Sequence, residues 1–374
     1  MQTSPANRYI PLDGLRGVAA IGIVAFHVAS GRFVWLQSFY LLVDFFFVLS
    51  GFVLWPSIPH ERVGLARSSG RFIVKRVFRF WPLVIAALVF AMVVLPGIRP
   101  LFGQTPWDSP AYGFPPLEQV GVIAAAFALL QIVVTPALFF DFPLWSLSAE
   151  WFANVIATPL AWVKHGLGIL LLVVVGYVLL AYGLHSDAFW IYGADGPVAW
   201  GPIRGWESLG RALIGFGLGL LLRKYLDRLT GLRNWWMLVI SLALIATMPV
   251  WVIATHATTF TYNITLWSAP IFALFILQIT RFNVLPGTRW GRFLEFLGVY
   301  SFGIYVFHGP IRSVWLLFGA PSVATLPSKI FVSTYQIIGI TALSIAVTYL
   351  ARRFVEAPIQ KWGKRVVGRM PVDK

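Results

Sequence analysis

The chain has 374 residues, of which 58% are hydrophobic and 11% are charged, and its formal net charge is +15 at pH 7. A soluble domain usually carries about 25% charged residues, so this composition argues against a water-soluble protein of two or three domains. The chain contains no cysteine, which excludes disulfides, a thiol nucleophile and cysteine-ligated metals.

Apolar runs of about 20 residues, the length that crosses a hydrocarbon core of ~30 Å, recur along the chain. These membrane segments are predicted at 15–33, 36–58, 80–96, 118–139, 144–162, 166–184, 209–223, 235–254, 264–280, 294–318 and 331–351. We therefore expect an all-α fold: one polytopic membrane domain over 1–374, with no appended soluble domain and no cleavable signal peptide.

The basic residues gather in short clusters between the apolar runs. The clusters lie in 59–80, 223–234, 281–293 and the tail after residue 351. Cytoplasmic loops carry such an excess of Lys and Arg, so we place these stretches and both chain termini on the cytoplasmic side. The same distribution argues against nucleic-acid binding, for which basic residues would gather with aromatics in a polar domain.

The number of crossings follows from Arg79 and Lys164, which we place on the same side although three apolar segments separate them. Two positions on the same side of the membrane must be separated by an even number of crossings, so one of the three segments does not cross. We choose 118–139, which is interrupted by Pro136, and predict a re-entrant or interfacial helix whose open backbone is covered by protein or water. The prediction is about ten transmembrane helices plus this segment.

Ionisable residues inside membrane segments cost at least ~2.5–3.5 kcal/mol each on insertion scales, so each is a functional candidate. Arg16 and His27 are eleven residues apart, which is three helical turns plus ~20°, so they share a helix face ~16 Å apart along the axis. Asp13 lies close to the same face. For an isolated pair of this kind, a cytoplasmic anchor and a hydrogen-bonded interior histidine are the favoured explanation.

The other polar residues in apolar segments strengthen the functional interpretation. They are Asp44, Ser146, Glu150, Ser301, Tyr305 and His308. Ser301, Tyr305 and His308 follow one another at i, i+4 and i+7 and so line one stripe. Four titratable groups lie roughly 6–10 residues from the outer ends of their segments, which is ~9–15 Å: His27, Asp44, Glu150 and His308. Unrelated structural residues would scatter in depth, so we predict a shared functional cavity.

A basic cluster of Arg71, Lys75, Arg76 and Arg79 precedes Trp81 at the entry to the third crossing. Guanidinium groups bind phosphate oxygens in a bidentate way, so the cluster is a candidate phosphate site. A topology signal or a patch for anionic membrane lipids explains the same charges.

Other chemistries have weaker support. The histidines show no metal-binding spacing, so no metal site is expected. The glycines of 215–219 are expected to permit close helix packing, and Glu356 is expected to anchor a helix end.

Five motifs, taken in order, resemble the acyltransferase-3 family of bacterial membrane O-acyltransferases, which includes O-antigen acetylases. The motifs are LDGLRGVAAIGIVAFH, VDFFFVLSGFVL, RFIVKRVFRFWP, WSLSAEWF and YSFGIYVFH, and the resemblance runs from about residue 8 to residue 360. The family commonly has a second acidic residue after Glu150, where this chain has Trp151. The resemblance implies a bacterial inner-membrane enzyme that transfers an acyl group, in the first place acetyl, from cytoplasmic acyl-CoA to a carbohydrate hydroxyl of a surface or exported polysaccharide.

The resemblance also implies roles for the polar residues. His27 would remove the proton of the acceptor hydroxyl, and an acid would hold its imidazole in the required tautomer. Depth favours Asp44 as that acid, whereas Asp13 belongs to the stronger motif. Acyl-CoA would be bound by Arg16, Arg76 and Arg79, and the acceptor by Glu150, Ser146, His308 and Tyr305. A covalent acyl-His27 or acyl-Ser146 intermediate is an alternative to direct transfer.

Two other functions fit parts of the same pattern. A secondary transporter of a sugar or anionic metabolite also has about ten crossings and polar groups at one depth, but no inverted repeat is visible in this sequence. A non-catalytic membrane scaffold would tolerate the loss of His27.

Overall fold

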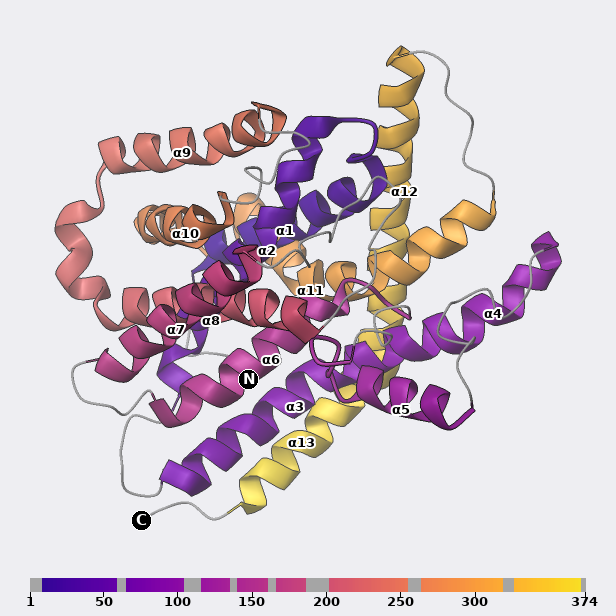
Figure 1. Cartoon of the computed structure of the whole chain (residues 1–374), viewed down its shortest axis with the longest axis horizontal. Coiled ribbons are helices and arrows are strands. Elements are labelled where there is room, and N and C mark those ends of the chain that lie inside the picture. The colour runs from indigo at the N-terminus through magenta and orange to yellow at the C-terminus, as the bar shows by residue number, and fades with distance from the viewer. Residues whose placement is uncertain are drawn as a thin grey trace.

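The computed structural model describes residues 9–58, 65–103, 116–134, 140–160, 166–185, 202–254, 264–318 and 326–370, and every regular element within them is helical. The prediction of an all-α polytopic membrane protein is confirmed. Figure 1 shows α1 and α2 near the centre of the helical assembly, with α7 to α10 on the left, α5 and α12 on the right, and α3 and α13 below.

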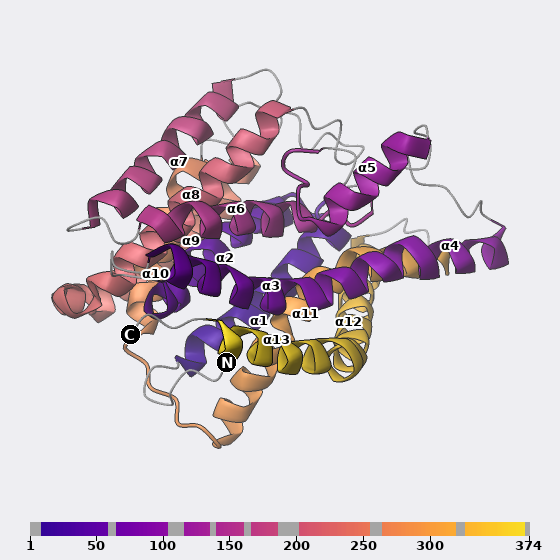
Figure 2. The same ribbon diagram turned by 90° about the horizontal axis from the view of Figure 1, so that it is seen from below.

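The helices of the first half are α1 (Ile10–Ala29), α2 (Leu42–Leu54), α3 (Leu65–Val89), α4 (Leu95–Ile98), α5 (Pro116–Phe127) and α6 (Leu144–Leu160). The 3₁₀ segment Val34–Leu41 leads into α2, and the π-helical turn Phe90–Val94 joins α3 to α4. Figure 2 shows α3 and α4 as one long rod that projects beyond its neighbours. The third segment therefore begins well before the predicted residue 80, and the basic cluster lies within its helix.

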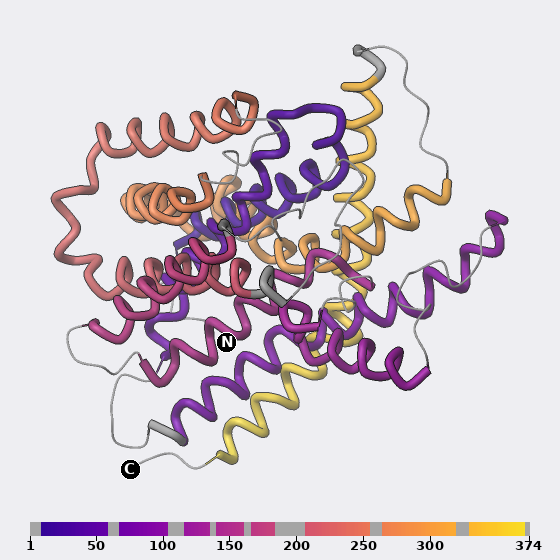
Figure 3. The backbone as a smooth tube through the Cα atoms, viewed as in Figure 1, coloured from indigo at the N-terminus to yellow at the C-terminus, as the bar shows by residue number. Residues whose placement is uncertain are grey.

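The helices of the second half are α7 (Leu167–His185), α8 (Pro202–Lys224), α9 (Trp235–Ala254), α10 (Thr265–Ile279), α11 (Arg289–Leu317), α12 (Leu326–Ala351) and α13 (Ala357–Arg369). A π-helical turn, Arg352–Glu356, joins α12 to α13. The chain changes direction there (Figure 3), so that α13 lies beside α3, with Phe78 and Trp362 in edge-to-face contact.

Five helical stretches in the described part of the chain are long and apolar enough to cross a membrane. They are Ile10–Ala29, Val34–Ser57, Arg67–Phe102, Trp235–Ala254 and Lys329–Arg369, and the shorter apolar helices are Pro116–Phe127, Leu167–Gly183 and Thr265–Ile279. The count of ten crossings stays a prediction.

The segment predicted to be re-entrant, 118–139, holds the short helix α5 of 12 residues. Such a helix is ~18 Å long, less than the ~30 Å hydrocarbon core. The backbone then turns at Leu129, which has a positive φ of 57°. The described part of 118–139 is therefore not a continuous spanning helix; Pro136 lies outside the described residues.

Close packing of α1 against α11 fixes the frame of the site. A Cβ atom at Gly17 would lie 2.5 Å from the Cβ atom of Leu297, which only glycine avoids. Gly298 lies in the same way against Asp13. Contacts further along join Arg16 to Ser301 and His27 to His308, so the two helices run in the same direction, as the first and ninth crossings should.

A second close contact joins α2 to α8. Gly51 lies against the backbone of Phe216, and Gly219 lies against the carbonyl group of Val48. The expected role of the glycines of 215–219 in helix packing is confirmed, because Gly215 meets Phe47 and Gly217 meets Val173 at distances that exclude a side chain.

We expect Gly219→Ala to lower the thermal stability of the protein, because its methyl group has no room beside the Val48 carbonyl. Overpacking of this kind costs about 1–3 kcal/mol or more. Intrinsic fluorescence during heating in detergent measures it. Gly70→Ala is the matched control, since a Cβ at Gly70 meets nothing within 4 Å; equal melting temperatures for the two variants would contradict the prediction.

Candidate functional site

The last turns of α1 and the middle of α11 bring His27 and His308 into direct contact. The Nε2 atom of His308 lies 2.9 Å from the Nδ1 atom of His27, and the two rings are stacked with their centroids 5.0 Å apart. His308 is fully buried, whereas His27 is partly exposed. Two histidines that are 281 positions apart in sequence therefore form one unit.

The hydrogen bonds of this pair assign its protons. The Nδ1 atom of His308 lies 2.6 Å from the carbonyl oxygen of Tyr305, which can only accept, so Nδ1 carries the proton. In a neutral imidazole the other nitrogen is then an acceptor. The Nδ1–H of His27 therefore donates to Nε2 of His308, and the Nε2 atom of His27 keeps a free lone pair. This arrangement makes His27 a base.

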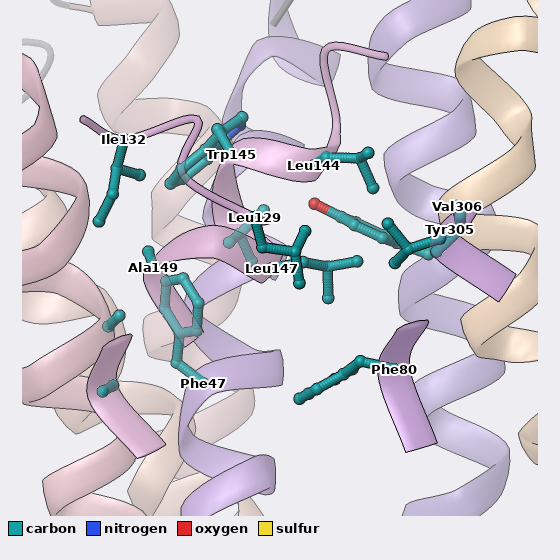
Figure 4. Packing of buried hydrophobic residues seen from close by; sticks show 14 of the residues in the cluster. Phe47, Phe80, Leu129, Ile132, Leu144, Trp145, Leu147, Ala149, Tyr305 and Val306 are labelled. Atoms are coloured by element: carbon teal, nitrogen blue, oxygen red, sulfur yellow. The ribbon is translucent and has the colours of Figure 1, made fainter. Parts of the chain in front are cut away.

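One turn before His308, the side chain of Tyr305 joins α11 to α6. Its hydroxyl lies 2.5 Å from Oγ of Ser146 and donates to the carbonyl oxygen of Pro143 at 3.1 Å. Figure 4 shows Tyr305 in an apolar cluster with Leu144 and Leu147 of α6. The structure thus brings together two of the predicted acceptor-binding residues, and it buries both.

Asp44 is not the partner of His27. Arg211 of α8 donates to both carboxylate oxygens of Asp44, at 3.0 and 3.1 Å, and the hydroxyl of Ser268 donates to Oδ2 at 2.7 Å. The ion pair is deeply buried, with Asp44 1% and Arg211 4% exposed. The prediction that Asp44 holds the tautomer of His27 is wrong, because this carboxylate is engaged in a pair that joins α2, α8 and α10.

Asp13 does not fill that role either. Its carboxylate lies 3.3 Å from the guanidinium of Arg16, and the 14 helical residues between Asp13 and His27 span ~21 Å. Arg16 also donates to Oγ of Ser301 and to the carbonyl oxygen of Gly298, both at 2.8 Å. The stripe predicted along α11 thus has Ser301 against Arg16 at one level and His308 against His27 at another.

Glu150 faces the basic cluster and not the histidines. Its Oε1 atom lies 3.1 Å from the guanidinium of Arg76 and accepts a hydrogen bond from Ser50. The guanidinium stacks over the ring of Phe80 at 4.1 Å. The prediction that Glu150 positions the acceptor beside His27 needs correction, because its contacts place it with the residues predicted to bind the donor.

Arg79 also has an acidic partner. Its guanidinium lies 2.9 Å from Oε1 of Glu356, and Arg352 lies 3.6 Å from the other oxygen. Glu356 is 3% exposed and lies at the turn between α12 and α13, so it ties this turn to α3. The side chain of Arg79 remains 43% exposed, which leaves part of it open to a ligand.

Three residues near these groups were missed by the sequence analysis. An arginine inside an apolar segment is the signal that identifies Arg211, since such a charge needs an acidic partner. Phe142 packs edge-on against both histidines, with ring centroids 4.6 Å from His27 and 6.0 Å from His308. Its neighbour Asp141 is 2% exposed, and no pattern around it indicates a role.

Among the residues that the structure describes, no group of three His, Asp or Glu side chains is placed to hold a metal ion.

Comparison with known proteins shows a family match over nearly the whole chain. Residues 9–353 match the protein family described as "Acyltransferase domain". Protein 2 in the picA locus of Rhizobium radiobacter is 34% identical over 162 residues, which cover 42% of this chain and 84% of that protein.

O-acetyltransferase OatA of Staphylococcus aureus is 26% identical over 395 residues, which cover 98% of this chain and 60% of OatA. The chain thus spans less than two thirds of the length of that relative. No solved structure matches.

Proposed function

The chain belongs to the acyltransferase-3 family, and from this premise we propose that it is a membrane O-acetyltransferase that moves an acetyl group from acetyl-CoA to a carbohydrate hydroxyl. The observation that carries the proposal is the His27–His308 pair, since its free Nε2 atom is the base that an O–H nucleophile needs. The relative OatA, named an O-acetyltransferase, supports acetyl as the group transferred.

The proposed reaction is a direct transfer. The acceptor oxygen attacks the thioester carbonyl carbon while its proton moves to Nε2 of His27. His308 accepts from Nδ1–H throughout and so stabilises the imidazolium. The C–S bond then breaks, and the imidazolium returns the proton to the departing sulfur, which leaves as the free thiol of coenzyme A. An acyl-Ser146 route has less support, because that hydroxyl is buried and bonded to Tyr305.

The donor would enter from the end of the bundle that carries Arg76 and Arg79. Both guanidinium groups already have a carboxylate partner, so phosphate groups would share or replace these contacts. Arg16 lies between this end and the histidines, ~16 Å from His27 along α1, where it would contact the donor chain. In the bacterial inner membrane this end would be cytoplasmic, and the acceptor would reach His27 from the opposite side.

The function is tested with purified protein in detergent, labelled acetyl-CoA and a panel of methyl hexosides and oligosaccharides. We expect release of free thiol together with label in the carbohydrate, and no label left on the protein after acid quenching. Label retained on the protein would replace direct transfer by a covalent route. Absence of both thiol release and labelled carbohydrate, together with donor-independent sugar flux in proteoliposomes, would refute the enzyme proposal.

We expect Arg79→Gln to raise the KM for acetyl-CoA about tenfold with little change in kcat, because a charge-assisted hydrogen bond to phosphate contributes roughly 1.5–3 kcal/mol. Initial rates against donor concentration measure it. Glu356 keeps Arg352 and Gln360 as partners in this variant, so the fold should persist. Arg353→Gln removes a charge nearby, from an exposed side chain, and serves as the control; equal KM values for both variants would contradict a specific phosphate contact.

A further inference from the structure

Asp141 is a buried carboxyl group with no hydrogen-bond partner in the part of the chain that the structure describes. It is 2% exposed, and no described residue donates to Oδ1 or Oδ2. Leaving such a group unpaired is costly, since buried polar groups in folded proteins nearly always have a partner. The other buried acids differ in this respect, because Asp44 has Arg211 and Glu150 has Arg76.

The position of Asp141 connects it to the histidine pair. It is followed by Phe142, which packs on both imidazoles, and by Pro143, whose carbonyl oxygen accepts from Tyr305. Its own Oδ1 atom lies against α11 at Gly309, where an added Cβ would come within 2.5 Å of it. Gly309 directly follows His308 in the sequence, so the carboxyl group of Asp141 lies beside the residue next to the histidine pair.

We infer that Asp141 accepts a hydrogen bond from a second hydroxyl group of the acceptor and thereby orients the reacting hydroxyl toward His27. The inference rests on the proposed function. The acetyl thioester brings only acceptor atoms to the reaction centre, a carbonyl oxygen and a sulfur, whereas a carbohydrate carries several O–H donors. The missing donor at Asp141 is therefore supplied by the acceptor, which must be a polyol with a hydroxyl near the one that is acetylated.

The test compares wild type with Asp141→Ala, using a methyl hexoside that the wild type acetylates and its monodeoxy analogues. We expect the KM for the hexoside to rise roughly 10- to 100-fold in Asp141→Ala, the effect of leaving a buried hydroxyl group of the acceptor without its hydrogen-bond partner. With wild type, one deoxy analogue should show the same rise in KM relative to the parent hexoside. With Asp141→Ala, the KM for that analogue should not exceed the KM for the parent hexoside. Thiol release to water, measured without any hexoside, should stay at the wild-type rate.

The melting temperature separates this role from a structural one. Removing an unpaired buried carboxylate relieves its desolvation, so Asp141→Ala and the isosteric Asp141→Asn should melt at or above the wild-type temperature. Asp141→Asn keeps one acceptor oxygen and should lose roughly 3- to 10-fold in KM. Asp227→Asn, at an exposed residue of the 3₁₀ segment Leu226–Leu232, is the control.

Two results would overturn the inference while leaving the proposed function intact. One is an unchanged KM for every hexoside in both Asp141 variants. The other is a lower melting temperature with a parallel fall in thiol release to water, which would assign Asp141 to the fold. If wild type neither releases thiol nor labels any carbohydrate, the proposed function itself has failed.

Discussion

Replacing His27 with alanine is expected to reduce kcat for acetyl transfer by about 10³-fold, within the range for loss of a positioned general base. The variant lacks the Nε2 lone pair that the hydrogen bonds between His27, His308 and Tyr305 leave free. Donor binding should persist, because the arginines predicted to bind acetyl-CoA lie at the other end of the site. Transfer of label at saturating donor, with KM determined separately, measures both quantities.

His308 should show a graded effect that His27 does not. In His308→Ala the Nδ1–H of His27 loses its acceptor, and we expect kcat to fall about 10²-fold. In His308→Gln the side-chain oxygen can accept that proton, so the loss should be clearly smaller. Ser313→Ala, one turn beyond Gly309 on the same helix, controls for general effects on α11. Wild-type activity in His27→Ala would refute the mechanism, and equal losses in the two His308 variants would refute the tautomer assignment.

The membrane segments could be predicted from the sequence because the bilayer imposes a length and a polarity on them. The predicted segments 144–162, 235–254 and 264–280 agree with α6, α9 and α10 within two residues. The predicted start of the third segment, residue 80, was wrong by about fifteen residues, because α3 begins at Leu65. The helix includes the basic cluster, whereas the apolar pattern begins only after that cluster.

The pairing of side chains was harder to predict. A common depth places residues at one level of the bundle, but it does not say which side of each helix they occupy. Asp44 therefore was expected beside His27, although its carboxylate faces Arg211. Glu150 was misassigned for the same reason, since one turn along α6 separates Ser146 at Tyr305 from Glu150 at Arg76.

The contacts of α6 and α11 connect the two ends of the site. On α11, Ser301 binds Arg16 and His308 binds His27, and Tyr305 lies between them. On α6, Ser146 binds Tyr305, and Glu150 lies one turn, ~5–6 Å, further along. Ser146 and Glu150 thus place the contact with Tyr305 and the contact with Arg76 on neighbouring turns of one helix.

Breaking the ion pair of Asp44 and Arg211 is expected to destabilise the protein by about 3–5 kcal/mol, because Asp44→Ala leaves a buried guanidinium uncompensated. The pair joins α2 to α8 at a point where both side chains are almost wholly buried. Heating in detergent, followed by the fluorescence of the 17 tryptophans, measures the loss. The double variant Asp44→Leu/Arg211→Met should recover most of it, since replacing a buried pair by apolar residues is often neutral or stabilising.

The same variants decide between a structural and a catalytic Asp44. If the pair serves the fold, the molecules of Asp44→Ala that remain folded should keep the kcat of wild type, and the double variant should be active. If Asp44 instead orients His27, as its depth in the sequence indicates, kcat should fall in both variants whatever their melting temperature. The observed geometry favours the first result, because His308 already supplies the acceptor that the imidazole of His27 requires.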